Sequence, residues 1–173
     1  DEIRGGDGDD VIDGMGGEDL LWGGDGNDTI SGHGVLNGGE GADTLVGSGT
    51  LHGGAGDDHL TLTDTVSVAD GGDGADTLLG NGTLKGGAGN DHLMGHGLLQ
   101  GGDGNDTLVG GGTLEGGAGA DHIIVTANAA KAANAATGAS VVDGGEGNDT
   151  IRASAVGTYK GGAGDDVITT DVA

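Results

Sequence analysis

Large and reactive side chains are nearly missing from this chain of 173 residues. It has no cysteine, no proline and no phenylalanine, and its aromatic residues are Trp22 and Tyr159. Without cysteine there is no disulfide framework and no thiol chemistry. Domains of this length normally fill one core with large apolar side chains, so a single thick core is excluded. The 46 glycines follow no Gly-x-y period and no proline accompanies them, which excludes a collagen helix.

Positive charge is equally scarce, with five Lys and Arg against 29 Asp and Glu and a net charge of −24. Five scattered cations cannot neutralise a phosphate backbone, so nucleic acid is excluded as a partner. Anionic membrane surfaces are disfavoured for the same reason. No apolar run approaches the roughly 18 residues of a membrane-spanning helix, and no signal-peptide pattern opens the chain. We therefore expect no membrane insertion by this segment.

A nine-residue repeat takes up most of the chain. The pattern is Gly-Gly-x-Gly-x-Asp-x-U-x, where U is apolar, and it occurs eleven times with one lapse at a glycine position, Met15. The eighth position is always Ile or Leu. The copies start at Gly5, Gly14, Gly23, Gly38, Gly53, Gly71, Gly86, Gly101, Gly116, Gly144 and Gly161.

A six-residue unit separates many of the copies, as in Gly80–Lys85 and Gly110–Glu115. It keeps the x-Leu-x strand of the nonapeptide but lacks three loop residues. We therefore expect one solenoid turn to contain nine plus six residues, with a long acidic loop, two short strands and a short glycine turn. The inward Ile and Leu side chains stack on their counterparts about 4.8 Å away in the next turn. A thin aliphatic ladder of this kind needs no aromatic residues.

The acidic loop offers oxygen ligands only. Its backbone carbonyls and one fixed Asp carboxylate, taken together with those of the next loop, form an all-oxygen cage. Hard oxygen ligands in a flexible site of high coordination number select Ca²⁺ over Mg²⁺, which demands stricter octahedral geometry. Carboxylates stacked about 4.8 Å apart repel one another unless a cation neutralises them, so metal binding and folding are expected to be one event.

These motifs resemble the RTX (repeats-in-toxin) family of calcium-binding nonapeptide repeats. The resemblance implies a right-handed parallel β-roll, all-β, with Ca²⁺ held between neighbouring loops, and export by type I secretion to an extracellular or cell-surface location. Carried over residue by residue, it implies that the metal ligands are Asp10, Asp28, Asp43, Asp58, Asp76, Asp91, Asp106, Asp121, Asp149 and Asp166.

The spacing of the copies predicts which edge of the roll each loop occupies. The loops of Asp10 and Asp28 lie 18 residues apart and share one edge, and Asp19 falls on the other edge without an acidic neighbour. Ten loops on one edge leave up to about nine gaps for calcium, and nine divalent ions would reduce the net charge to about −6. The alternative is a duplicated 30-residue unit whose loops alternate between edges, so that Asp91 pairs with Asp58 and Asp121.

Two other features of the sequence carry expectations of their own. The stretch 125–143 interrupts the rhythm, and its alanine-rich part near 126–137 favours a short helix outside the roll. His92 and His96 resemble half of a zinc motif, but on a strand that leads into a glycine turn this spacing does not place both rings on one face. No Gly-x-Ser-x-Gly motif signals a hydrolase, so we expect no enzyme activity and no catalytic residue in this chain.

We interpret residues 1–173 as a single roll domain, with an insertion at 125–143, that forms a segment of a larger secreted protein. Its expected function is to fold on calcium binding after export and to serve as a rigid scaffold beside neighbouring domains of the same chain, as in an adhesin or surface layer. The alternative is a non-catalytic module that binds extracellular polysaccharide or a partner beside a secreted epimerase, protease or lipase domain.

Overall fold

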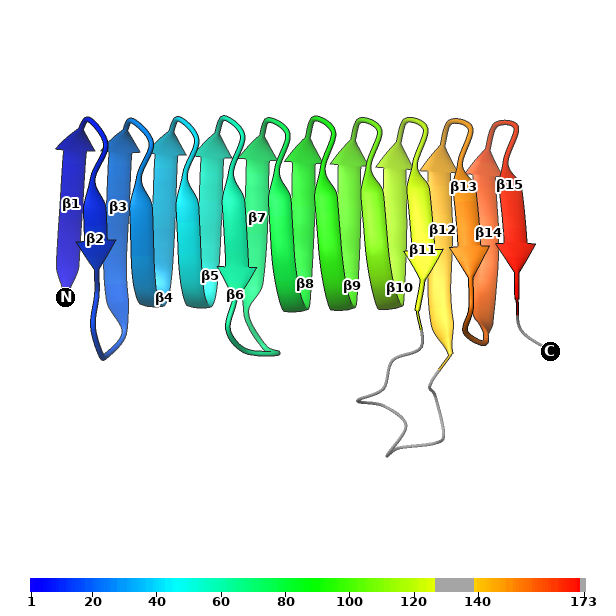
Figure 1. The fold of residues 1–173 in the computed structure, drawn as a ribbon, viewed down its shortest axis with the longest axis horizontal. Coiled ribbons are helices and arrows are strands. Elements are labelled where there is room, and N and C mark those ends of the chain that lie inside the picture. Colours follow the sequence, from blue (N-terminus) through cyan, green and yellow to red (C-terminus); the bar gives the residue numbers. More distant parts are fainter. Residues whose placement is uncertain (127–138, 172–173) are drawn as a thin grey trace.

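The computed structural model describes residues 1–126 and 139–171, and these residues form a parallel β-roll with β1 and β15 at opposite ends (Figure 1). All neighbouring strands pair in parallel, and the described residues contain no helix. The strands are β1 (Glu2–Asp7), β2 (Val11–Asp13), β3 (Asp19–Asp25), β4 (Thr29–Glu40), β5 (Thr44–Ala55), β6 (His59–Leu62), β7 (Val68–Asp73), β8 (Thr77–Ala88), β9 (His92–Asp103), β10 (Thr107–Ala118), β11 (His122–Val125), β12 (Ser140–Glu146), β13 (Thr150–Ala153), β14 (Gly157–Ala163) and β15 (Val167–Thr170).

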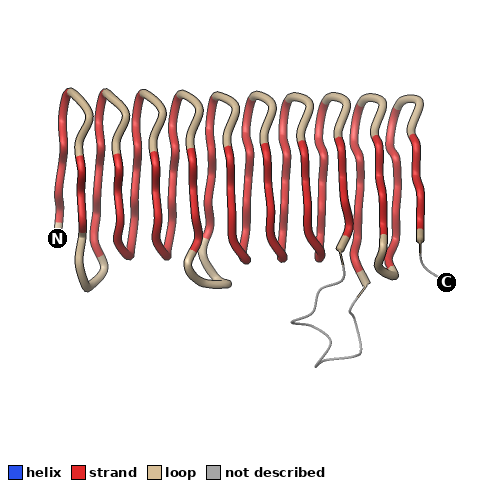
Figure 2. Tube along the Cα trace, viewed as in Figure 1, coloured by secondary structure: helices blue, strands red, loops and turns tan. Residues whose placement is uncertain are grey.

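Two sheets face each other across the core, and five long strands contribute to both. Strands β4, β5, β8, β9 and β10 each run down one sheet, pass through a Gly-x-Gly turn and return along the other. The first sheet holds the strand that ends each nonapeptide, and the second sheet holds the strand that precedes each long loop. The nonapeptide loops, except that of Asp19, lie at one edge, which we call the loop edge. The short turns lie at the other edge, the turn edge, together with the loop of Asp19 and the loop that joins β6 to β7 (Figure 2).

The register follows the nine-plus-six rule. In β8 and β9, Thr77 pairs with His92 and Leu84 with Leu99, so that successive turns are 15 residues apart. The same offset joins β9 to β10 and β4 to β5. The 30-residue alternative is therefore wrong, because it would place β8 beside a strand 30 residues away.

The core consists of two aliphatic ladders, one from each sheet. Leu93 of the first sheet and Leu99 of the second are both fully buried, as are their counterparts in the neighbouring turns. Near the C-terminal end Tyr159 takes the place of Leu in the second ladder, pairs in register with Val142 and packs against the core. The prediction of a thin Ile/Leu core without Phe is confirmed.

The insertion needs two corrections. The helix expected near 126–137 falls almost entirely on residues outside the described part, and Thr126, which is described, is not helical. The break in the roll is also narrower than 125–143, because Val125 continues β11 and Ser140–Asp143 belong to β12. Alternating burial in both strands fixes these limits, since Val125 and Val142 point into the core. Among the described residues, no helix is long and apolar enough to span a membrane.

Candidate metal site along the loop edge

The ten predicted aspartates form one continuous row inside the loop edge. In each pair of neighbouring loops, the backbone N–H of one Asp donates to Oδ1 of the Asp in the next turn. The N···O distances are 2.7–3.0 Å along the whole row. Asp76 and Asp91 therefore lie in adjacent loops, which confirms the assignment of these loops to one edge.

The second oxygen of each carboxylate is buried without a partner. Oδ2 of Asp91 accepts no hydrogen bond from the described residues, and eight other members of the row share this state, Asp166 at the end being the exception. Within the row, the aspartates from Asp28 to Asp149 are each only 1–2% exposed. Buried carboxylates are costly unless hydrogen-bonded, paired with a cation or bound to metal. This row of oxygens therefore has the chemistry of a hard-cation site, and Ca²⁺ fits it.

Glycines recur at fixed positions of each repeat, and because they lack a side chain they leave room around the carboxylate. At Gly86, the first glycine of the Asp91 loop, an added Cβ would overlap Oδ2 of Asp91 and come within 2.5 Å of the Gly101 carbonyl oxygen. The next glycine, Gly87, has a φ of 120°, a conformation that residues with a side chain rarely adopt. The loop glycines therefore bring backbone carbonyls close to the carboxylate, as an oxygen cage requires.

Burial also changes the acidity of the row. It raises the pKa of Asp58 and Asp106 from 3.8 to about 7, and that of Asp76 and Asp121 to about 6. The backbone N–H donated to each carboxylate opposes this effect, while charge repulsion from a neighbouring Asp of the row adds to it. The pKa values of Asp43, Asp91 and Asp149 are raised by the same burial. Without a cation, the row resists ionisation at neutral pH.

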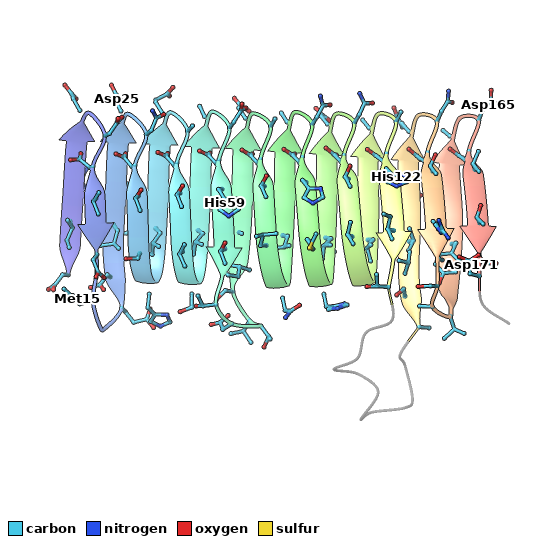
Figure 3. The ribbon with its side chains drawn as sticks, viewed as in Figure 1. Met15, Asp25, His59, His122, Asp165 and Asp171 are labelled. Carbon is cyan, nitrogen blue, oxygen red and sulfur yellow. The ribbon has the colours of Figure 1, made fainter. Side chains whose placement is uncertain are left out.

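A second row of side chains, which the sequence reasoning missed, lies at the rim of the loop edge. Position five of a loop accepts a backbone N–H from position five of the next loop, as when Asn27 donates to Oδ1 of Asp9 at 2.8 Å. Asn90 and Asn105 accept in the same way. The recurrence of Asn or Asp at this position was the available signal. Asp25 and Asp165 mark the exposed outer rim in Figure 3.

Asp19 lies at the turn edge, as predicted, but it has an acidic neighbour. The N-terminal ammonium of Asp1 donates to Oδ1 of Asp19 at 2.8 Å, which is the relationship found along the loop edge. The expectation that Asp19 stands alone is wrong because residues Asp1–Arg4 match positions six to nine of a nonapeptide. On its other side Asp19 meets the short turn at Gly34, which supplies no carboxylate.

Within residues 1–126 and 139–171, no group of three acidic or histidine side chains converges to hold a metal ion. A site built from side chains alone, as transition metals often use, is therefore not formed there. His92 lies on the outer face of the first sheet, and His96 lies in the Gly95–Gly97 turn. A metal at the loop edge must therefore take backbone oxygens in addition to carboxylates, which again favours Ca²⁺.

The comparison with protein families decides the assignment. The family model for the RTX calcium-binding nonapeptide repeat matches residues 1–30, 31–49, 47–64, 79–97, 98–112, 113–126, 134–155 and 158–171. The chain belongs to this RTX repeat family. No curated protein and no solved structure matches it. As an RTX roll it has the parallel β-architecture and the calcium-binding repeats of the family, with most of its long loops gathered on one edge.

Proposed function

We propose that this RTX roll is a calcium-dependent structural module in which Ca²⁺ ions lie between successive loops of the loop edge. The observation that carries the proposal is the row of buried Oδ2 atoms, from Asp10 to Asp149, that have no hydrogen-bond partner in the part of the chain that the structure describes. The ten aspartates, with carbonyls of the loop glycines, would hold the ions. Ten loops leave up to about nine gaps, and bound calcium would supply the positive charge that the row lacks.

Repulsion within the row makes calcium a condition for folding. Ionised carboxylates about 4.8 Å apart repel by roughly 3 kcal/mol per neighbouring pair at an effective dielectric constant of about 20. A core of two thin ladders offers little to offset this repulsion repeated over the ten loops. The metal-free chain is therefore expected to be expanded, and the calcium-loaded chain to be a rigid rod about 45 Å long.

This requirement suits a protein that is exported before it folds. We propose that the module is secreted by a type I route, folds where calcium is plentiful outside the cell, and separates or supports neighbouring domains of a longer chain. A folding switch driven by calcium needs no other cofactor, because one ion both neutralises the loops and connects adjacent turns.

Isothermal titration calorimetry tests the proposal directly. Metal-stripped chain titrated with CaCl₂ is expected to bind several ions, up to about nine, with heat that includes folding. MgCl₂ at the same concentration should bind far more weakly, because Mg²⁺ dehydrates reluctantly and requires octahedral geometry. Equal binding of both ions, or binding of one or two calcium ions only, would contradict a row of sites between loops.

We propose no catalytic role for the chain. One group of side chains resembles a hydrolytic triad, but the backbone N–H that such a site would need is already donated elsewhere. His33 joins Glu18, at 2.8 Å from its Nε2, to the hydroxyl of Ser48 at its Nδ1, in the order of a hydrolytic triad. The N–H of Gly49, which follows the serine, is donated to Oγ of Ser67 at 2.6 Å. It is therefore not free to stabilise an oxyanion, which acyl transfer requires.

A second candidate function, binding of an extracellular polysaccharide, is favoured by one observation. The guanidinium of Arg4 lies over the Trp22 ring at 4.1 Å from its centroid, on the outer face of the second sheet. An aromatic ring beside a cation provides stacking and hydrogen bonding for a sugar. Binding of the calcium-loaded chain to a glycan array, with loss of that binding in Trp22→Ala, would support this function. A calcium-loaded chain that binds no glycan on the array would contradict it.

A further inference from the structure

The middle of the outer face of the first sheet, between Asp13 in β2 and Arg152 in β13, carries no acidic side chain, lysine or arginine. From Thr29 to Ile124, the side chains that point outward from this sheet are Thr, Ser, His and aliphatic residues, without any Asp, Glu, Lys or Arg. The chain as a whole has a net charge of −24. The second sheet, in contrast, presents Asp70, Lys85 and Glu115 over the same turns.

Two rows with different shapes make up this uncharged face. In one row, each residue comes directly after the buried Ile or Leu of its strand, on the side away from the loop edge. This row is aliphatic apart from Thr61. Met94 in it is 45% exposed and Val46 is 39% exposed. Its members, in register, are Val46, Thr61, Leu79, Met94, Val109 and Ile124.

The other row alternates large and small side chains. In register it runs Thr44, His59, Thr77, His92, Thr107 and His122. Figure 3 shows His59 and His122 on the same face of the roll. Histidine ridges and threonine hollows therefore alternate at steps of about 4.8 Å, each kind recurring about every 9.6 Å, and a surface of this kind fits a copy of itself displaced by one turn.

We propose that this face is a self-association surface, whose partner is a second copy of the chain. A two-fold axis parallel to the strands, passing between neighbouring turns, places each His of one copy opposite a Thr of the other and the aliphatic rows against each other. The uncharged face lets two such acidic chains approach. Sheets pack about 10 Å apart, so the two loop edges lie about 20 Å from each other, beyond the screening length of about 8 Å at physiological ionic strength.

The size of the face sets the strength of the contact. Six strands about 4.8 Å apart, each contributing about four residues, cover roughly 400 Å² per copy. A stable dimer needs about 800 Å² per partner. The association is therefore weak, with a dissociation constant on the order of 1 mM, and tandem or surface-bound copies would strengthen it through their high local concentration.

Sedimentation equilibrium of the calcium-loaded chain, at concentrations up to about 1 mM, tests this surface with variants from single strands. Met94→Lys in β9 places a charge in the aliphatic row and is expected to lower the association constant at least tenfold. Leu98→Lys, in the same strand but on the outer face of the second sheet, is the matched control and should change it less than twofold.

A second pair tests shape without charge. Thr107→His fills a hollow and should weaken association, whereas Thr113→His, in the same strand on the opposite sheet, should not. A folded wild-type chain that shows no self-association at about 1 mM, an equal effect of both members of a pair, or an association that Met94→Lys leaves unchanged would overturn the inference. Circular dichroism of the same samples separates the two proposals, since a chain that fails to fold in calcium overturns the proposed function as well.

Discussion

The backbone N–H of Asp91 donates a 2.8 Å hydrogen bond to Oδ1 of Asp106, one turn further along the roll. The hydrogen bond fixes the height of one carboxylate relative to the next and leaves Oδ2 of each free of protein partners among the described residues. Since the same bond joins every pair of neighbouring loops, a local change in one carboxylate is expected to affect mainly the two gaps beside it.

Asp91→Asn tests this locality. The amide retains an oxygen that can accept the N–H of Asp76, but the ligand charge is lost, so calcium binding should weaken in the two gaps beside residue 91 and remain intact near Asp166. Calorimetric stoichiometry should fall by about one or two ions. Asp103→Asn removes an exposed rim carboxylate of the adjacent loop and serves as the control. An equal loss in both variants would show that net charge, and not the buried row, determines binding.

Gly86→Ala tests the space around the carboxylate. A methyl group there overlaps Oδ2 of Asp91 and the carbonyl region of Gly101, so calcium affinity and the midpoint of thermal unfolding in calcium should both fall. Gly16→Ala is the matched control, because its methyl group meets no atom within 4 Å and Gly16 has no positive φ. A Gly86→Ala chain that binds calcium like the wild type would contradict the proposed position of the cage.

The pH dependence of the metal-free chain follows from the raised pKa values. Burial holds the pKa of Asp58 and Asp106 at about 7 in the roll, against 3.8 for an unperturbed carboxyl. Between these values the folded state binds more protons, so the stability of the metal-free roll falls as pH rises from about 4 to about 7. Far-UV circular dichroism of metal-stripped chain should show more β-structure at pH 4 than at pH 7.

Screening provides the control for that experiment. Sodium chloride at pH 7 weakens general repulsion between exposed charges but does little for the buried row. We therefore expect acid to induce more β-structure than salt does. Less β-structure at pH 4 than at pH 7 would contradict the sign of the effect, and an equal response to salt would assign it to net charge alone.

The core ladder gives a prediction that does not involve the metal ligands. Leu93 is fully buried in the first sheet, so Leu93→Ala leaves a cavity and should lower the free energy of unfolding in excess calcium by about 2–5 kcal/mol. Met94→Ala, one residue along and 45% exposed, should change it by less than about 1 kcal/mol. Urea unfolding in excess calcium measures both. Equal losses would contradict the placement of the ladder.

Most of this fold could be predicted from the sequence because each turn repeats the same local rules. The Ile or Leu at position eight fixes which side of each strand faces the core, as Leu93 and Leu108 show. The six-residue unit fixes the 15-residue step, so the position of Asp91 beside Asp106 follows from counting. In a solenoid, spacing along the sequence determines spatial neighbours directly.

The features that were missed depend on partial repeats or on hydrogen bonds between turns. Asp1 lies beside Asp19 because Asp1–Arg4 match the last four positions of the nonapeptide pattern, which a search for whole motifs overlooks. Asn or Asp recurs at position five in the sequence, but the acceptor role of Asn27 and Asn105 at the loop rim follows only once the loops are stacked. At 125–143 the repeat stops, and alanine content alone could not show that Val125 and Val142 return to the core ladder.

A calcium titration of the metal-stripped chain, followed by far-UV circular dichroism at pH 7, tests the central claim most directly. The account predicts a disordered spectrum without calcium, a cooperative gain of β-structure on its addition, and full reversal with excess EGTA. A β-roll that persists in excess EGTA would contradict it, because the buried row of aspartates would then be stable without a cation.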